Sequence, residues 1–151
     1  MDLKKLIREY YNSNKHMQLS TVSNGQPWIC TVYYVSDSDF NLYWTSGRSR
    51  QHSIEINADS RAAVTIVKDA ERKQALQIIG SAYEVNNNDL IRVHNLYQEK
   101  FGQKDYDLEE MKNNNPDGRA YWVFKPTVIS LWDEVNFPDN PKQIFELHQN
   151  D

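Results

Sequence analysis

A polar segment between two predicted elements holds the residues best suited to chemistry. Residues 43–45 end a predicted strand with Tyr, Trp and Thr, and residues 46–52 then read Ser-Gly-Arg-Ser-Arg-Gln-His. A helix that begins here exposes unpaired backbone N–H groups and the positive end of its dipole, which attract anions. The serine hydroxyls add donors, and an arginine adds a planar fork suited to a phosphate or carboxylate. The segment predicts a phosphate-binding turn, although the same composition also occurs in ordinary loops.

The elements that would position this turn are mostly strands. Segments rich in β-branched and aromatic residues predict strands at 16–22, 28–35, 40–45, 62–67, 76–85, 120–125 and 128–135. Asn24-Gly25 predicts a hairpin between the first two, and Pro126 separates the last two. A short helix is expected after the turn, up to about Asn57. Mostly antiparallel strands with a few helices predict a mainly β fold, a closed or nearly closed β-barrel.

The rest of the chain is predicted to be helical or irregular within a single domain, 1–151. Leu3, Leu6 and Ile7 begin an apolar stripe at helical spacing, which predicts an amphipathic helix over residues 2–14. Residues 88–115 are expected to form a helical insertion of unassigned role. The polar residues 138–151 are expected to be a loosely held tail.

The ordered series of motifs resembles the FMN-binding split-barrel superfamily, the flavoproteins related to pyridoxamine 5'-phosphate oxidase. The matching pieces are Thr45, Ser49-Arg50, His52, Asn57 and Gly80-Ser81-Ala82, within residues 16–135. Two positions depart from the family pattern: Gln51 replaces the usual Lys, and Ala58-Asp59 replaces the usual Asn-Pro. The chain is therefore read as a divergent member. The resemblance implies an antiparallel, six-stranded barrel of Greek-key type that binds FMN.

The resemblance also implies roles for individual residues. Ser49 and Arg50 would hold the FMN phosphate, and Thr45 and Ser46 would lie at the flavin's edge or ribityl chain. Val32 and Tyr33, or Tyr34, would lie along the ring. No catalytic residue is assigned, because a bound flavin itself carries the redox chemistry.

Three residues keep two interpretations each. His52 either donates to the phosphate or is a surface residue at the start of a helix. Gln77 either hydrogen-bonds the polar edge of the ring or points outward from its strand. Arg48 either joins the anion site or lies on the surface.

The resemblance implies a homodimer that shares the flavin at its subunit interface, and an oxidoreductase acting on an unidentified small molecule. The true oxidases carry an Arg-Leu-x-Pro segment near the C-terminus, which this sequence lacks, so oxidation of vitamin B6 is not expected. A non-catalytic flavin carrier with a stress-related role is the alternative. Heme or a deazaflavin could also replace FMN on the same fold.

Composition excludes several other classes. The net charge of −4 argues against a nucleic-acid-binding protein, which usually shows a basic face. The histidines His16, His52, His94 and His148 lack a metal-ligand spacing, so no metal is expected. The single cysteine, Cys30, fits a reducing compartment. The N-terminus carries charges where a signal peptide is apolar, and no apolar run is long enough for a membrane span, which together predict a cytoplasmic protein without membrane association.

Overall fold

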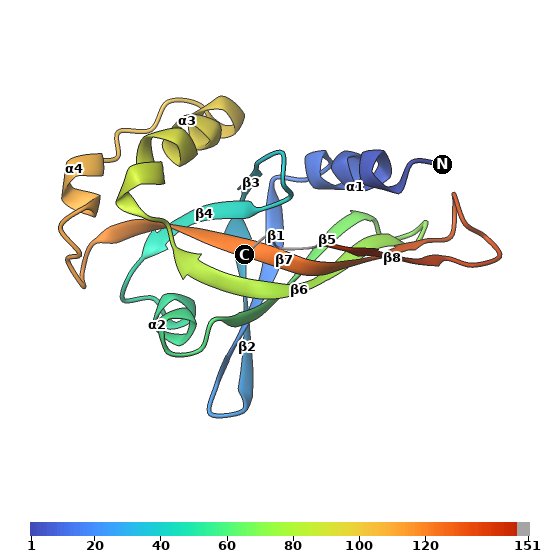
Figure 1. Ribbon diagram of the computed structural model, residues 1–151, viewed down its shortest axis with the longest axis horizontal. Helices are drawn as coiled ribbons and strands as arrows, with labels where there is room; N and C mark the ends of the chain where they lie inside the picture. Colours follow the sequence, from blue (N-terminus) through green and yellow to red (C-terminus); the bar gives the residue numbers. More distant parts are fainter. Residues whose placement is uncertain (148–151) are drawn as a thin grey trace.

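The computed structural model describes residues 1–147 and shows a strongly curled antiparallel sheet with helices packed around it (Figure 1). The fold is mainly β, as the sequence predicts, and it is a split barrel. The strands are β1 (His16–Ser23), β2 (Gln26–Tyr33), β3 (Val35–Ser36), β4 (Leu42–Gly47), β5 (Arg61–Asp69), β6 (Gln74–Glu84), β7 (Arg119–Asp133) and β8 (Lys142–Glu146). The helices are α1 (Leu3–Asn12), α2 (Gln51–Ala58), the 3₁₀ turn η1 (Asn87–Asp89), α3 (Leu90–Phe101) and α4 (Leu108–Met111).

The long strand β7 joins the parts of the sheet, because it pairs with β6 over most of its length. The first half of β7 also pairs with β4, and its second half pairs with β8. The sheet order is therefore β2-β1-β5-β6-β7-β4-β3, with β8 branching from β7. β4 stays paired with β7 as far as Gly47, and the chain then leads through a short turn into α2 (Figure 1).

The central strands bury one face and leave the other uncovered. Cross-strand partners on the buried face are Leu19, Val64, Ile78 and Ile129, all of which lie in the main core. The neighbouring row on the outer face runs Ser20, Ala63, Ile79 and Val128. Ile79 in this outer row is 57% exposed. This row of the outer face therefore presents small and apolar side chains to solvent.

Residues 1–147 form eight strands, two more than the six expected for the barrel. One reason is Tyr34, which ends β2 although the sequence predicts a single strand over residues 28–35. Its ring is fully buried, and its hydroxyl donates to the carbonyl oxygen of Tyr11 at 2.6 Å. The backbone turns there, and Val35 begins the short β3, which pairs with β4.

The predicted break at Pro126 is a β-bulge instead. Gly80 pairs with Pro126, while its neighbour Ile79 pairs with Val128, so Thr127 is an extra residue in one continuous β7. Bulges tolerate proline because the ladder is already interrupted there. A Cβ added at Gly80 would clash with the backbone oxygen of Lys125, so only glycine fits the close approach of the two strands.

The prediction of a loosely held tail is also wrong for residues 142–147. Residues Lys142–Glu146 form β8 on the free edge of β7, and the backbone N–H of Leu147 donates to the carbonyl oxygen of Thr127 at 2.9 Å. Phe145 meets Phe40 edge-on, with ring centroids 5.9 Å apart. The last four residues, 148–151, lie outside the described part of the chain.

Residues 88–115 cover the outer side of β4 and the first half of β7. A second apolar cluster joins Val93 and Tyr97 of α3 and Met111 of α4 to Tyr121 and Val123 of β7. His94 is buried in the same layer, where its Nδ1 lies 2.7 Å from the hydroxyl oxygen of Tyr121. The insertion therefore packs beside the end of β4, where the turn predicted to bind phosphate begins.

Candidate functional site

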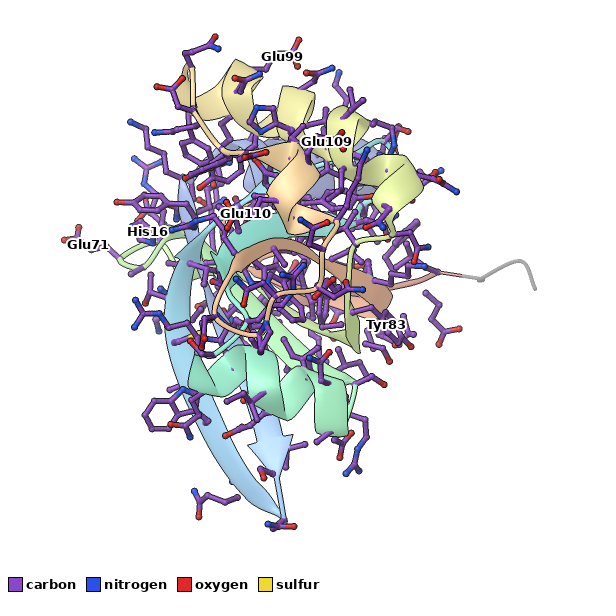
Figure 2. All side chains as sticks on the ribbon, turned by 90° about the vertical axis from the view of Figure 1, so that its left-hand side faces the viewer. His16, Glu71, Tyr83, Glu99, Glu109 and Glu110 are labelled. Atoms are coloured by element: carbon purple, nitrogen blue, oxygen red, sulfur yellow. The ribbon has the colours of Figure 1, made fainter. Side chains whose placement is uncertain are left out.

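A hollow of about 610 Å³ lies at the end of β4, bounded by β2, α2, α3 and the segment before β7. This volume falls within the usual range for small-molecule sites, about 300–1,000 Å³. Figure 2 views this end of the molecule, with α2 across the lower part and α4, marked by Glu109 and Glu110, above the sheet. The hollow is lined by Thr31, Val32, Tyr33, Thr45, Ser46, Gly47, Ser49, Arg50, His52, Tyr97, Tyr106, Asp117, Gly118 and Arg119. Seven of the eight binding residues expected from the sequence are therefore brought together, and Gln77 is the exception.

Side-chain contacts hold the start of α2 in place, and none of them involves the backbone N–H groups of its first turn. Arg50 is the N-cap residue in an extended conformation, and no side chain caps the helix. The hydroxyl of Ser53 donates instead to the carbonyl oxygen of Gly47 at 2.9 Å. Glu55 is buried and accepts from the Thr21 hydroxyl at 2.9 Å, which ties α2 to β1. The first-turn N–H groups thus remain available to an anion beside Ser49 and Arg50.

His52 lies inside the hollow, which contradicts the surface interpretation. Only 9% of the residue is exposed, and its Nε2 lies 2.9 Å from the Ser46 hydroxyl oxygen. Burial lowers the pKa of His52 below its ordinary value, and the nearby positive charge of Arg50 lowers it further, whereas Glu55 opposes the shift. His52 is therefore neutral near pH 7 and can exchange a hydrogen bond with Ser46.

The arginines of the turn have different partners. Arg48 points away from the hollow: its Nε donates to Glu84 Oε1 at 2.8 Å, and its side chain is 8% exposed. Neither interpretation of Arg48 from the sequence is correct, since it is a buried structural residue. Arg50 and Arg119 line the hollow, and neither pairs with a carboxylate of residues 1–147. Two guanidinium groups are thus free to meet an anionic ligand.

The edge strand β2 supplies one wall of the hollow. Val32 is 8% exposed and belongs to the main core, whereas Tyr33 is 58% exposed. The ring of Tyr34 packs inside the barrel, so the sequence alternative that placed Tyr34 beside the ligand is wrong. The ligand-facing surface of this wall is made by Tyr33, Thr31 and the strand edge.

A further wall comes from residues that the sequence did not single out for this site. Tyr97 lies on α3, Tyr106 lies between α3 and α4, and residues 117–119 lead into β7. Arg48 holds this segment close, because it donates to the carbonyl oxygens of Met111 at 2.6 Å and Asn115 at 2.9 Å. The sequence pattern predicted that Tyr97 lies in a helix. No pattern of neighbouring residues indicated that Tyr106 or Arg119 would approach β4.

Gln77 lies outside the hollow, on the uncovered face of the sheet. It pairs with Thr65 on one side and Ser130 on the other, and its side chain is exposed. Thr31, which does line the hollow, is three strands away in the same cross-strand row, a distance of roughly 14 Å at the usual strand spacing. Gln77 therefore points outward and does not face the hollow of its own chain.

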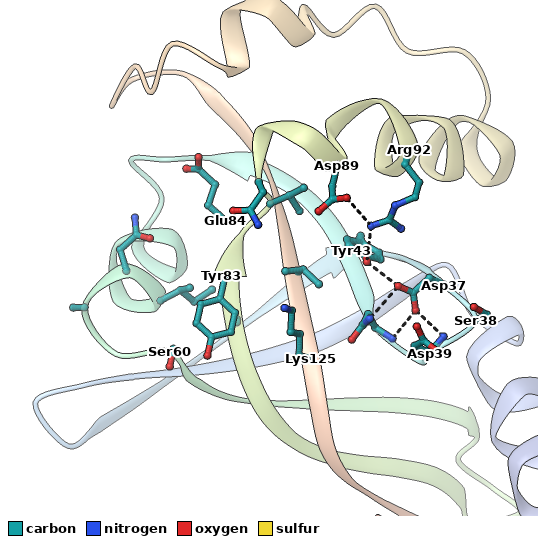
Figure 3. Close-up of a pocket in the computed structure, with 18 residues that line it drawn as sticks. Asp37, Ser38, Asp39, Tyr43, Ser60, Tyr83, Glu84, Asp89, Arg92 and Lys125 are labelled. Carbon is teal, nitrogen blue, oxygen red and sulfur yellow. Dashed lines mark hydrogen bonds and ion pairs between the residues drawn. The ribbon is translucent and has the colours of Figure 1, made fainter. Parts of the chain in front are cut away.

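A larger cavity of about 950 Å³ lies between α2 and α3 over β6 and β7 (Figure 3). Four of its six charged groups already have partners within the protein, whereas Asp39 and Lys125 form no ion pair within residues 1–147. Asp37 accepts from the Tyr43 hydroxyl at 2.7 Å and from both the backbone and the side chain of Asn41, and Arg92 lies 3.5 Å from Asp89. The smaller hollow at the end of β4 is the better candidate, because its arginines and helix start are free.

Within residues 1–147, no three His, Cys, Asp or Glu side chains are arranged to hold a metal ion. Among the helices of the same residues, none has the length and apolar character needed to cross a membrane.

Comparison with known proteins adds a family and a set of related folds. A family model described as pyridoxamine 5'-phosphate oxidase matches residues 3–133. A candidate pyridoxamine 5'-phosphate oxidase from Listeria innocua superposes with a TM-score of 0.69 at 17% identity, covering 86% of this chain and 98% of its own. General Stress Protein 26 from Bacillus anthracis gives a TM-score of 0.67 at 18% identity, with 97% and 100% covered.

The matched structures also include a heme binding protein from Mycobacterium smegmatis. It superposes with a TM-score of 0.73 at 14% identity, and the match covers 97% of this chain but 58% of that one. This chain spans a similarly small share, 55%, of another matched structure. At these identities the likeness concerns the fold. No curated protein sequence matches at a significant level.

Proposed function

Because this chain belongs to the pyridoxamine 5'-phosphate oxidase family of FMN-binding split-barrel proteins, we propose that it binds FMN and serves as an oxidoreductase for a small molecule. The observation that carries the proposal is the uncapped start of α2, which lies with Ser49 and Arg50 in a hollow bounded by the edge of β2. When bound, the flavin supplies the electron-transfer chemistry. The chain has to bind and orient it.

The residues of the hollow fit the parts of FMN in order. The first turn of α2, Ser49 and Arg50 offer backbone, hydroxyl and guanidinium donors, which suit a phosphate. Thr45 and Ser46 follow along β4 with hydroxyls for the ribityl chain. Val32 and Tyr33 offer a strand edge and an aromatic side chain for the ring. The neutral His52 adjoins Ser46 at 2.9 Å, and so fixes that hydroxyl.

We further propose that two copies of the chain share the flavin across a dimer interface. The outer face of the sheet carries Ile29, Ile79 and the small residue Ala63 in one cross-strand row. Ile29 is 61% exposed, and soluble monomers rarely leave such apolar surface uncovered. Thr31 and Tyr33 of the hollow lie on exposed positions of β2, so a partner on this face would also complete the site.

This arrangement gives Gln77 a role in the partner's site. Its amide is exposed on the same outer face, and it is too far from its own hollow to act there. In a dimer formed through this face, the amide would approach the flavin of the other subunit and hydrogen-bond its polar edge. Mixed dimers can test the assignment directly.

A second candidate is a flavin, deazaflavin or heme binder without turnover. It is favoured by one matched structure that is named a heme binding protein and another that is named a stress protein. The geometry of this chain supports heme less well, since the single histidine of the hollow, His52, already engages Ser46 through Nε2. We propose a cytoplasmic location, because a free thiol such as Cys30 stays reduced there.

The absorbance spectrum of the purified protein tests the proposal, after FMN is added and the excess is removed. Retained flavin bands, with one FMN per chain and the mass of a dimer by light scattering, are the expected result. A Soret band after incubation with hemin, without retained flavin, would favour the second candidate. Reduction of the bound flavin by NADH or NADPH, followed by reoxidation with an acceptor, separates an enzyme from a carrier.

A further inference from the structure

Lys100 lies near the C-terminal end of α3 and has no part in the proposed flavin site. Its Nζ donates to the backbone oxygen of Tyr34 at 2.8 Å and lies 3.9 Å from the centroid of the Tyr34 ring. No carboxylate of residues 1–147 forms an ion pair with it. We propose that Lys100 is a modification site, a reactive amine that is acylated by activated acyl donors such as acyl phosphates or thioesters.

The amine of Lys100 rests on an aromatic and uncharged surface. Tyr34 is fully buried, and its hydroxyl donates to the carbonyl oxygen of Tyr11 at 2.6 Å. Burial raises the pKa of Tyr34, so this phenol stays neutral and adds no charge. The ring of Phe101 gives a second aromatic face, with its centroid 5.4 Å from Nζ. A lysine normally keeps its ammonium group in water or beside a carboxylate, and Lys100 has exchanged both for one carbonyl oxygen and two rings.

These surroundings favour the neutral amine, which is the nucleophilic form. Burial lowers the pKa of Lys100 from its ordinary value of 10.5 to about 8. At pH 7.5 about 25% of such side chains are neutral, against about 0.1% for an ordinary lysine. Desolvation in apolar surroundings is one way in which enzymes turn lysine amines into nucleophiles. The residue as a whole is exposed, so a donor can reach it from solvent.

The proposed reaction is an acyl transfer to nitrogen. The neutral Nζ attacks the carbonyl carbon of the donor, and an N–C bond forms. The C–O bond to phosphate, or the C–S bond to the thiol, breaks, and the leaving group departs with the bonding electrons. The attacking nitrogen gives one proton to water, so the product is a neutral amide and no redox partner is needed.

Acylation would also break a contact between α3 and the sheet. Lys100 ties the end of α3 to the backbone at residue 34, between β2 and β3. The neighbouring ring of Phe101 lies 5.6 Å from Tyr33 and 4.8 Å from Tyr97, and both tyrosines line the hollow. An acyl group removes the charge that faces the Tyr34 ring and adds bulk at the contact. Modification of Lys100 therefore loosens the end of α3 beside the hollow.

Competitive labelling of the full chain measures the reactivity of each lysine. The protein is treated with acetyl phosphate at pH 7.5 and with trace acetic anhydride over a range of pH, and mass spectrometry quantifies each acetylated lysine. Lys125 is the matched control, because its Nζ lies 5.8 Å from the Tyr83 ring and it forms no ion pair within residues 1–147, but it is exposed and has no hydrogen bond to a carbonyl there. We expect Lys100 to react at least about tenfold faster than Lys125 at pH 7.5, with a rate that levels off above about pH 8.

Two further comparisons make the result decisive. In urea-unfolded protein the two lysines should react alike, which would show that the fold activates Lys100. Hydrogen exchange within residues 96–106 should quicken in the acetylated protein and in Lys100→Gln, and should stay closer to the wild type in Lys100→Arg, which keeps the charge. A folded-state rate no faster than that of Lys125, or one still rising steeply near pH 10, overturns the modification site. Unchanged exchange after acetylation overturns the loosening of α3. All of these measurements use protein without added flavin, so they do not depend on FMN binding.

Discussion

Arg48 and Glu84 form a short ion pair across 36 residues of sequence, with Arg48 Nε 2.8 Å from Glu84 Oε1. The same guanidinium donates to the carbonyl oxygens of Met111 and Asn115, and the backbone N–H of Arg48 donates to Gly118 at 2.9 Å. One side chain therefore connects the turn after β4, β6 and residues 111–118, which lead into β7. It positions the site without touching the hollow.

Replacing Arg48 should destabilise the fold and also loosen the side of the hollow that is formed by Tyr97, Tyr106 and Arg119. Arg48→Ala leaves two carbonyl oxygens and a partly buried carboxylate without their donor, so we expect a loss on the order of 2–4 kcal/mol in the free energy of unfolding. Urea denaturation measures it. Limited proteolysis should also cut sooner within residues 102–118, because Arg48 no longer holds that segment.

Arg61 provides a matched control for this prediction. Its pair with Asp59 is shorter, at 2.6 Å, but the Arg61 side chain is 78% exposed. Exposed ion pairs contribute little because water screens them. Arg61→Ala should therefore unfold at the same urea concentration as the wild type. Equal effects of the two substitutions would show that burial of Arg48 does not determine its contribution.

Arg50→Ala should weaken FMN by about 1–3 kcal/mol, the usual loss for a charge-assisted hydrogen bond. Riboflavin lacks the phosphate, so its affinity should not change. Quenching of flavin fluorescence measures both dissociation constants. A folded Arg50→Ala variant with unchanged FMN affinity would remove Arg50 from the phosphate site.

The environment of His52 predicts a pH dependence with a definite sign. Burial lowers the pKa of His52 below its ordinary value of 6.5, so the unfolded chain binds this proton more readily than the folded one. The stability associated with neutral His52 is thus complete above about pH 6.5 and is lost as the pH falls through that value toward the lower pKa of the folded state. His52→Asn should flatten this part of the curve of unfolding free energy against pH. Parallel curves for the two proteins would contradict the assignment.

Bulge geometry at Gly80 predicts a local intolerance of any side chain. Gly80→Ala brings a methyl group against the backbone oxygen of Lys125, so the strands must separate. We expect the free energy of unfolding to fall by about 1–3 kcal/mol, the usual cost of overpacking. Thermal or urea unfolding measures it, with Ser81→Ala as the neighbouring control. A Gly80→Ala protein as stable as the wild type would mean that β6 and β7 can separate here at little cost.

The sequence was informative where the relevant signal is local. The prediction of a phosphate-binding turn depends on closely spaced hydroxyls, arginines and a helix start. Ser46, Ser49 and Arg50 do line one hollow, whereas Arg48 points away from it. The pairing of Arg48 with Glu84 and the stacking of Arg119 on Tyr106 join residues from separate elements. Neither pair leaves a pattern along the chain, because strand order alone decides which elements meet.

The strand β8 and the position of Gln77 show the same limit. Residues 142–146 contain only two apolar side chains, too few to distinguish a strand from a polar tail, and the free edge of β7 supplies the pairing. Gln77 was assigned to the ring from its place in a strand. The order β2-β1-β5-β6 puts that strand far from the hollow of its own chain.

Mixed dimers can show whether Gln77 acts on the partner's flavin. Arg50→Ala damages the phosphate end of a chain's own site, whereas Gln77→Leu would damage the site of the other subunit. A dimer that combines one chain of each kind then has one doubly damaged site and one site with both residues intact. After refolding of the two variants together, a fraction of the bound FMN should regain wild-type affinity and reduction potential, although neither variant alone shows it. If Gln77 acted within its own chain, every site in the mixture would keep one defect and no wild-type fraction would appear.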